Sequence, residues 1–361
     1  MRIITFAQAQ PGMELARDLL DKEGNLLLEK GIKLTAQYIK RLQFLGLPAL
    51  YIIDPLLEDL EDRLLLPAAL HREAIRCLSE LFHGKVSELL RSAQTRDMYF
   101  RRVHHTVDRM VDTISSRSRD LVNYNICHLG DSIVNHSLNV CLLSIVIGVT
   151  ANLPAEALKE LAMGALLHDI GKLCIPPHIL NKPDGLTAEE LIEIRKHALH
   201  GYNIVRLSDI ISPAAACTVQ QHHERYNGSG YSAGLRGEEI HLFGRICAIA
   251  DVFEAMTADR IYRPPIPRKT VIEKMVSTGY RDFDLRQLQL FLHNIPVYPV
   301  GSLVTLSTGE QGYVIRNHAR TSLRPVVRIT TERDGLPLRI PKDIDLATNQ
   351  YAHITEVNII G

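Results

Sequence analysis

The chain has 361 residues, enough for two or three domains with at least one sizeable hydrophobic core. Its 41 Lys and Arg residues balance its 41 Asp and Glu residues, which argues against a nucleic acid polymer or an anionic membrane as the partner of the whole chain. The six cysteines are scattered without a Cys-x-x-Cys pair, which argues against a disulfide framework and favours reduced thiols in a cytoplasmic protein.

The N-terminal residues lack the apolar region of a signal peptide. One long run without charged residues, 132–155, contains an apolar core of ten residues, 140–149. A membrane span needs about 20 mostly apolar residues. We therefore expect a buried core helix in this run and no membrane span.

Residues 1–56 predict a small α+β module. Short β-rich runs occur at 3–6, 26–28 and 50–53. Thr35 is a candidate cap for a helix through 38–45 that Gly46 and Pro48 would stop. No spacing typical of catalysis is present, so we interpret the module as regulatory or docking.

Residues 57–125 are charged and carry apolar residues at helical spacing, which predicts a helical connector. It could transmit a signal or form a homodimer surface, and the sequence does not separate these roles. Residues 297–361 change to a period of two with turn signals between short runs, which predicts a β-rich and barrel-like appendage. Its expected strands are 303–306, 312–315, 325–330 and 352–355.

Residues 126–296 are dominated by helical periodicity and predict an all-α bundle that forms the chemical core. Thr187 and Glu190 form a capping box that fixes the start of one helix. The expected helices are 131–150, 154–169, 187–207, 213–223, 241–258 and 268–278.

The pair His168-Asp169 follows an apolar helical stretch and precedes Gly171. Adjacent residues on a helix point about 100° apart, so both side chains can meet at one metal only where the helix ends. We expect Gly171 to end it in a left-handed C-cap conformation. A buried carboxylate needs a partner, which could be a metal ion or simply a hydrogen bond between the two side chains.

Other nitrogen and carboxylate side chains lie beside apolar runs at intervals of about thirty residues. Each could be an ordinary core or capping residue when considered alone. Together, five histidines and two aspartates without a thiolate suit two metal ions such as iron or manganese, bridged by a carboxylate, with Asp169 as the natural bridge. Such a pair of ions activates a water for in-line attack at phosphorus. The candidate ligands are His136, His168, Asp169, His197, His222, His223 and Asp251.

The ordered motifs of this core resemble those of the HD-GYP family, a branch of the HD-domain metal-dependent phosphohydrolases. The resemblance covers about 126–295, and it implies a mainly α chain with an HD-type helical bundle core. The matching segments are 136–140 (HSLNV), 168–172 (HDIGK), 197–201 (HALHG), 222–225 (HHER), 228–231 (GSGY) and 251–260 (DVFEAMTADR).

The resemblance implies metal-dependent hydrolysis of cyclic di-GMP to linear pGpG, and in some members on to GMP. It implies catalytic roles for Asp169 and Lys172, with Lys172 contacting the scissile phosphate. Tyr231, Arg260 and Arg263 match substrate-binding residues, and the fork of an arginine suits phosphate oxygens. It assigns one metal to His136, His168, Asp169 and Asp251, and the other to Asp169, His197, His222 and His223.

Two positions depart from the family pattern. Ser232 stands where the signature has proline, so we expect a less rigid loop and a weaker case for GGDEF-domain partners. Ser132 stands where some members carry a glutamate that supports a third metal, and Asp131 is one residue out of register. We therefore expect two metals.

Three other functions remain open. One is hydrolysis of another cyclic dinucleotide such as cyclic GMP-AMP, because no motif separates guanine from adenine. Another is a non-catalytic cyclic-dinucleotide sensor or adaptor, although the complete ligand set argues against it. The last is generic HD nucleotidase activity, which the doublet His222-His223 and the loop through Tyr231 make less attractive.

Overall fold

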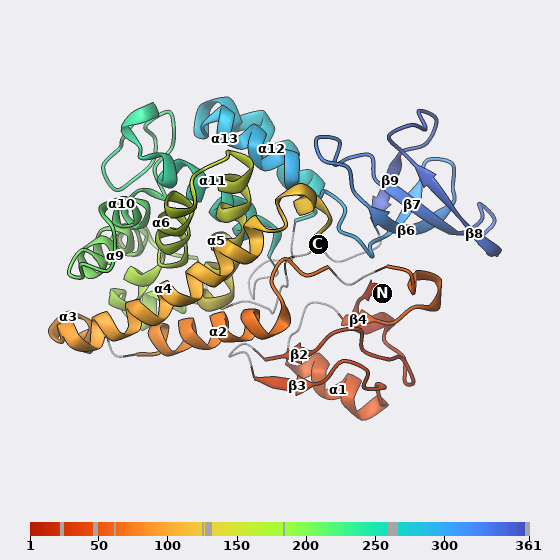
Figure 1. Cartoon of the computed structure of the whole chain (residues 1–361), viewed down its shortest axis with the longest axis horizontal. Helices are drawn as coiled ribbons and strands as arrows, with labels where there is room; N and C mark the ends of the chain where they lie inside the picture. Colours follow the sequence, from red (N-terminus) through yellow and green to blue (C-terminus); the bar gives the residue numbers. More distant parts are fainter. Residues whose placement is uncertain are drawn as a thin grey trace.

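The computed structural model describes residues 1–21, 25–45, 50–60, 63–84, 86–124, 126, 132–182, 185–258 and 266–357. Its largest part is a helical body, and two small β-containing parts lie side by side at one end of that body (Figure 1). One of them is the N-terminal module, and the other is the C-terminal sheet. The mainly α fold expected from the sequence is confirmed.

The N-terminal module pairs β1 (Arg2–Ile4) with β4 (Leu50–Ile52) and β2 (Leu19–Leu20) with β3 (Leu26–Leu28), both antiparallel. Helix α1 (Ala36–Phe44) begins after Thr35, whose side chain accepts the N–H of Tyr38 as a cap. A small apolar core holds these elements together. The predicted stop residues Gly46 and Pro48 lie outside the described residues.

The helical body has a single hydrophobic core cluster that runs from the connector through the expected chemical core. Apolar faces of α2 and α4 pack into the same cluster as α5, so the connector helices are part of the body. Its helices are α2 (Ala68–Phe82), α3 (Val86–Arg91), α4 (Ala93–Ser115), α5 (Ile133–Thr150), α6 (Ala155–Leu166), α7 (Pro177–Leu180), α8 (Ala188–Arg195), α9 (His197–Val205), α10 (Pro213–Gln221), α11 (Leu242–Thr257), α12 (Arg268–Asp282) and α13 (Leu285–Asn294).

Helix α5 lies at the centre of this body (Figure 1). Within the described chain it is the one helix whose length and apolar character would suffice to cross a membrane, and 78% of that window is buried inside the protein. It packs against α2, α4, α6, α11 and α13. This burial agrees with the core helix expected from the sequence.

Two predicted helices end or break earlier than expected. The helix expected at 154–169 ends at Leu166 and is followed by a 3₁₀ turn, Ile170–Cys174, so that His168 and Asp169 lie in the connection. The helix expected at 187–207 divides at Lys196 into α8 and α9. Its start is as predicted, because Thr187 and Glu190 form the capping box.

The C-terminal sheet is antiparallel with the strand order β8-β7-β6-β5-β9. Barrel closure is not observed among the described strands, where β8 and β9 are the edges. Strand β8 was not predicted, because an edge strand with two prolines and many charged residues lacks apolar alternation. The strands are β5 (Leu303–Leu306), β6 (Gln311–Arg316), β7 (Val326–Thr331), β8 (Pro337–Asp345) and β9 (Ile354–Val357).

Candidate metal centre

The seven candidate ligands converge in the helical body, although they come from five separate places in the chain. His136 lies in the first turn of α5, His168 and Asp169 follow α6, and Asp251 lies in the middle of α11. His197 begins α9, and the His222-His223 doublet follows the last residue of α10. Their ligand atoms form two groups, each within 4.8 Å: Asp169, His197, His222 and His223; and His136, His168 and Asp251.

Asp169 lies between the two groups. Its Oδ2 is 3.3 Å from Nε2 of His168 and 3.6 Å from Nε2 of His136. Its Oδ1 is 3.4 Å from Nε2 of His197 and 4.0 Å from Nε2 of His222. One carboxylate therefore presents one oxygen to each group, which is the arrangement of a bridging ligand.

Three histidines are oriented by hydrogen bonds to backbone carbonyls of the helix that precedes each of them. In each, Nδ1 donates to the backbone carbonyl three residues earlier, which leaves the Nε2 lone pair free to bind a metal. The Nδ1···O distances are 2.8 Å from His168 to Ala165, 2.7 Å from His197 to Ile194 and 2.8 Å from His222 to Val219.

The group around His197 contains acceptor atoms that lack a donor. Nε2 of His197 and Nε2 of His222 are 3.2 Å apart, yet both nitrogens carry lone pairs because both Nδ1 atoms are the donors. Oδ1 of Asp169 is buried and has no hydrogen-bond partner among the described residues. A cation would satisfy these three atoms, and the all-nitrogen and oxygen donor set suits a divalent transition metal.

The other group contains a carboxylate that the sequence analysis missed. Nε2 of His136 lies 3.2 Å from Oδ1 of Asp251, while its Nδ1 donates to the Glu254 carboxylate in a short hydrogen bond. Asn139 donates to the other oxygen of Glu254 at 3.3 Å. Glu254 follows Asp251 by one helical turn, and this spacing was the only sequence signal that could have identified it.

Protonation states favour metal binding in the group around His197. Burial lowers the pKa of His222 well below its usual range and lowers that of His223 to about 3, so both rings are neutral at pH 7. Burial opposes ionisation of Asp169, but Lys172 and His168 outweigh it and hold the pKa of this carboxyl well below its usual range. Neutral imidazoles and ionised carboxylates are the ligand forms of these side chains.

The charge around His136 is different. Burial alone would lower the pKa of His136, but the carboxylates of Glu254 and Asp251 raise it to about 10. Burial likewise opposes ionisation of Asp251, while contacts with His136 and His223 hold its pKa well below its usual range. The carboxylates therefore favour positive charge at this position, which either a proton or a metal ion can provide.

Gly171 has a different role from the predicted left-handed C-cap. It is not among the described glycines with positive φ. A Cβ at this position would lie 1.9 Å from the carbonyl oxygen of His197 and 2.4 Å from the amide nitrogen of Gly201. Glycine is needed because the 3₁₀ turn packs directly on the backbone of α9, and this contact brings Asp169 beside His197.

The predicted substrate residues lie at the edge of the centre where they are described. Nζ of Lys172 is 2.5 Å from Oδ2 of Asp169, and its side chain is 25% exposed. The Tyr231 ring stacks on His223 with a centroid distance of 4.7 Å, and the guanidinium carbon of Arg195 lies 5.2 Å from the Tyr231 ring. Arg260 and Arg263 lie outside the described residues.

Tyr231 keeps its proton. Burial, followed by the negative charges of Asp251 and Asp169, raises the pKa of this phenol well above its usual range. Its hydroxyl makes no hydrogen bond to another described residue, so it is available as a donor to a ligand.

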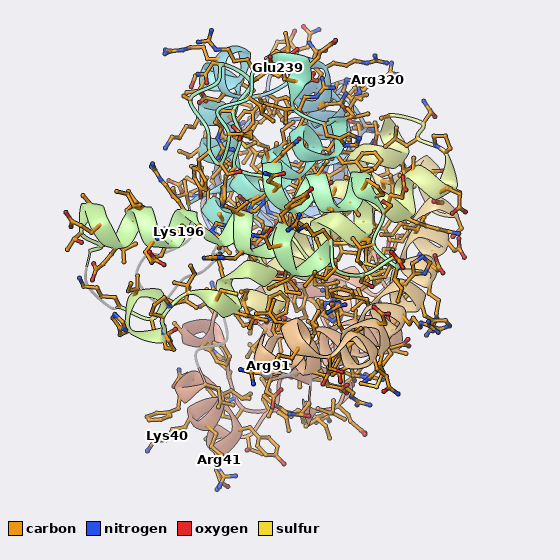
Figure 2. The ribbon with its side chains drawn as sticks, turned by 90° about the vertical axis from the view of Figure 1, so that its left-hand side faces the viewer. Lys40, Arg41, Arg91, Lys196, Glu239 and Arg320 are labelled. Carbon is orange, nitrogen blue, oxygen red and sulfur yellow. The ribbon has the colours of Figure 1, made fainter. Side chains whose placement is uncertain are left out.

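Figure 2 labels Lys196, the residue between α8 and α9 that directly precedes the candidate ligand His197.

Comparison with known proteins agrees with the helical fold. Residues 112–286 match the HD domain family, and residues 303–359 match a KOW domain associated with HD domain. One relative is the cyclic di-GMP phosphodiesterase PA4108 of Pseudomonas aeruginosa, which is 36% identical over 194 residues, covering 54% of this chain and 47% of the relative. Another is the 3′3′-cGAMP-specific phosphodiesterase 2 of Vibrio cholerae, 38% identical over 133 residues, covering 36% of this chain and 25% of the relative.

The chain spans about half or less of the length of these curated relatives. A solved structure, Bd1817, an HDG"Y"P protein from Bdellovibrio bacteriovorus, aligns with a TM-score of 0.50 at 17% identity. The alignment covers 80% of this chain and 97% of that structure. At this identity the likeness supports the fold.

Proposed function

We propose that this chain, whose residues 112–286 match the HD domain family, is an HD-GYP protein and hydrolyses a phosphodiester bond of a cyclic dinucleotide. The observation that supports this function most strongly is the position of Asp169, with one oxygen facing each group of imidazoles. Cyclic di-GMP is the proposed substrate, and linear pGpG, with GMP after a second cleavage, the proposed product.

The proposed metal ligands follow the two groups. His136, His168 and Asp251 would hold one divalent ion, and His197, His222 and His223 would hold the other, with Asp169 shared between them. When bound, two such ions, iron or manganese, would stabilise negative charge on the phosphate and activate the attacking water.

Lys172 and Tyr231 would hold the phosphodiester. The Lys172 ammonium contacts Asp169 and is partly exposed, so it can approach a phosphate oxygen placed against the centre. Its charge would stabilise the negative charge that develops at phosphorus. The Tyr231 hydroxyl would donate a hydrogen bond to substrate, because it is protonated and has no described hydrogen-bond partner. Arg260 and Arg263 would contribute phosphate contacts from the segment that follows α11.

Hydrolysis of cyclic GMP-AMP is the second candidate function. Two relatives in Vibrio cholerae bear the name 3′3′-cGAMP-specific phosphodiesterase, at 38% identity each. None of the side chains assigned above is proposed to contact a nucleobase. Cyclic di-GMP and cyclic GMP-AMP therefore fit the same metal and phosphate contacts. The complete ligand set favours an enzyme over a sensor that only binds the nucleotide.

The parts outside the HD domain are assigned regulatory roles in this proposal. Residues 1–56 would receive a signal, and the connector would transmit it, because α4 packs against α6, the helix that precedes His168. A homodimer or a GGDEF-domain protein would act on these parts. A chain that lacks residues 1–56 and keeps the connector helices in the hydrophobic core should then lose the regulation that the full chain shows in cell extract.

The first test is an anaerobic incubation of the metal-loaded chain with cyclic di-GMP or cyclic GMP-AMP. We expect metal-dependent formation of linear dinucleotide or GMP. Asp169→Ala should lose both ions and all turnover, whereas Asp209→Ala, at an exposed carboxylate, should behave as wild type. Turnover by Asp169→Ala at the wild-type rate would rule out the bridged two-metal site.

Lys172→Ala provides a second test of the same assignment. We expect it to retain both ions and to lower turnover by roughly 10²–10³-fold, because an electrostatic contact to the phosphate is lost. The measurement is kcat alongside metal content by mass spectrometry. Loss of the metals together with turnover would instead assign Lys172 a role in holding Asp169.

A further inference from the structure

Glu224 is a buried carboxylate that belongs to neither metal group. It directly follows His223 and is only 2% exposed. Its Oε1 accepts the backbone N–H groups of Ala233 at 2.6 Å and Gly234 at 3.2 Å, and its Oε2 accepts that of Leu235 at 3.1 Å. Three consecutive amides thus surround one carboxylate, as in a backbone nest that binds an anion.

These bonds close a loop that carries Tyr231. The N–H of Tyr231 donates to the carbonyl of His223 at 3.2 Å, on the other side of the same turn. A Cβ at Gly230 would lie 2.4 Å from the amide nitrogen of Arg225 and 2.4 Å from Cα of Glu224, so the loop backbone packs directly on this segment. The loop is therefore held on both sides of Tyr231, whose ring stacks on His223.

We propose that Glu224 is the positioning residue of this loop: it fixes Tyr231 against His223 for substrate binding and so determines substrate affinity. The inference rests on the proposed function. Ser232 stands between Tyr231 and the three amides, where the sequence predicted a less rigid loop for lack of proline. Hydrogen bonds to an ionised carboxylate are stronger than those to neutral groups, and Glu224 makes three of them.

The test variant is Glu224→Gln in the full, metal-loaded chain. The amide keeps the size of the side chain but removes its charge and directs an NH₂ group at backbone N–H donors. We expect KM for cyclic di-GMP to rise about tenfold or more, because a charged hydrogen-bond network is lost. We expect kcat to change less than about twofold, with both ions retained, because no metal ligand is altered.

A matched control lies in the same segment. Glu239 accepts the N–H of Arg236 at 2.8 Å but is exposed, and Figure 2 labels it at the surface. Glu239→Gln should keep the wild-type KM. Tyr231→Phe should raise KM, and Glu224→Gln should add less than about threefold in that background, since both changes act through the same hydroxyl. Full additivity would contradict the proposed route through Tyr231.

Amide hydrogen exchange over 225–241 provides a readout that does not need activity. We expect faster exchange at Ala233, Gly234 and Leu235 in Glu224→Gln, with exchange in α9 and α10 unchanged. Wild-type KM with wild-type exchange would overturn the inference, as would a fall in kcat and metal content at unchanged KM. If Glu224→Gln does not fold, Glu224→Asp takes its place, because it keeps the charge on a shorter side chain. We then expect KM to rise by less than about tenfold above the wild-type value, and a wild-type KM would overturn the inference.

The two proposals fail in different ways. If the wild-type chain hydrolyses none of the cyclic dinucleotides, the proposed function fails, while the exchange comparison still decides whether Glu224 holds the loop. If the wild type is active and Glu224→Gln equals it in KM and exchange, only the role of Glu224 fails.

Discussion

At the scale of single residues, Glu254 is a carboxylate that would act on the proposed metal centre through the candidate ligand His136. Its carboxylate accepts from Nδ1 of His136 and is held in turn by Asn139. Such a partner fixes the ring orientation of a histidine ligand and increases its basicity. A substitution of Glu254 should therefore change metal binding in the His136 group more than in the His197 group. In the His197 group, Nδ1 of His197 and Nδ1 of His222 donate to backbone carbonyls instead of a carboxylate.

Glu254→Gln is expected to weaken metal binding in the His136 group by about 10–100-fold, the usual effect of losing such a partner. Binding in the His197 group should change little. Titration of the metal-stripped chain with Mn²⁺, followed by calorimetry, should show one weakened site and one unchanged site. The control is Glu238→Gln, at an exposed position. Equal weakening of both sites would contradict the separate roles of the two groups.

The residue scale also shows what the sequence could predict about the site. The convergence of the seven candidate ligands was predictable because each is a nitrogen or carboxylate side chain beside an apolar helical run. Glu254 was not predicted, because its spacing of one helical turn from Asp251 does not reveal its partner His136, which lies 118 residues away. The structure brings the seven candidate side chains together, and metal binding by them is part of the proposal.

Protonation gives a prediction for the metal-stripped chain. Burial lowers the pKa of His223 to about 3 and that of His222 well below 6.5, the value usual for an unfolded histidine. The unfolded state binds more protons below pH 6.5, so the free energy of unfolding should fall as the pH decreases from 6.5 toward 4. His136 has the opposite shift, to about 10, so its contribution is full below pH 6.5 and is lost progressively as the pH rises from 6.5 to about 10.

Urea unfolding of the metal-stripped chain between pH 7 and pH 4.5 measures this slope. His223→Gln should flatten it, because the neutral amide cannot take up a proton. His104→Gln, at an exposed histidine, should leave the slope unchanged. An identical slope in wild type and His223→Gln would show that other groups govern acid lability.

At the scale of elements, the site depends on the contact between the 3₁₀ turn after α6 and helix α9. The contact is close because Gly171 has no side chain and Gly201 faces it from α9. The turn carries Asp169 at its start, and α9 carries His197 at its start. The distance between these two elements therefore sets the distance between Asp169, the proposed bridging carboxylate, and the candidate ligand His197.

Gly171→Ala should separate these elements. An added Cβ would overlap the His197 carbonyl, and overpacking of this kind costs about 1–3 kcal/mol or more of stability. We expect a lower melting temperature and loss of metal from the His197 group. Gly185→Ala is the matched control, because a Cβ there meets nothing within 4 Å. A Gly171→Ala chain with wild-type stability and two bound ions would show that the turn can shift without cost.

Element boundaries were predicted less well than element types, for physical reasons. Lys196 divides α8 from α9 within a stretch that carries neither Gly nor Pro, so no local signal marks the break. The role of Gly171 depends on a contact with residues about 30 positions away, which local dihedral arguments cannot report. The Thr187 cap was predictable because a capping box is local in sequence.

At the scale of the whole molecule, the N-terminal module contacts the C-terminal sheet. The N–H of Ile3 donates to the Gly301 carbonyl at 3.4 Å, and Arg2 donates to the Tyr313 hydroxyl at 3.2 Å. Figure 1 shows the N-terminal module and the C-terminal sheet side by side at one end of the helical body. A signal received by residues 1–56 would thus reach both the connector and the sheet.

The sheet is joined to the helical body by a reciprocal hydrogen-bonded pair. Oδ1 of Asn123 accepts the Asn317 N–H at 2.6 Å, and its Nδ2 donates to the Asn317 carbonyl at 3.1 Å. Both residues are buried. Asn123→Ala would leave two buried backbone groups without partners, each costing about 1–3 kcal/mol.

We expect Asn123→Ala to loosen the sheet while leaving the proposed metal centre intact. Limited proteolysis should release the C-terminal region faster than in wild type, and the melting temperature should fall. Metal content and kcat at low temperature should remain unchanged, because no metal ligand contacts this pair. Asn181→Ala, at an exposed position, should match wild type in every measurement. If Asn123→Ala instead lost metal or turnover without faster proteolysis, the contact would act on the active centre itself, and the sheet would belong to the catalytic unit.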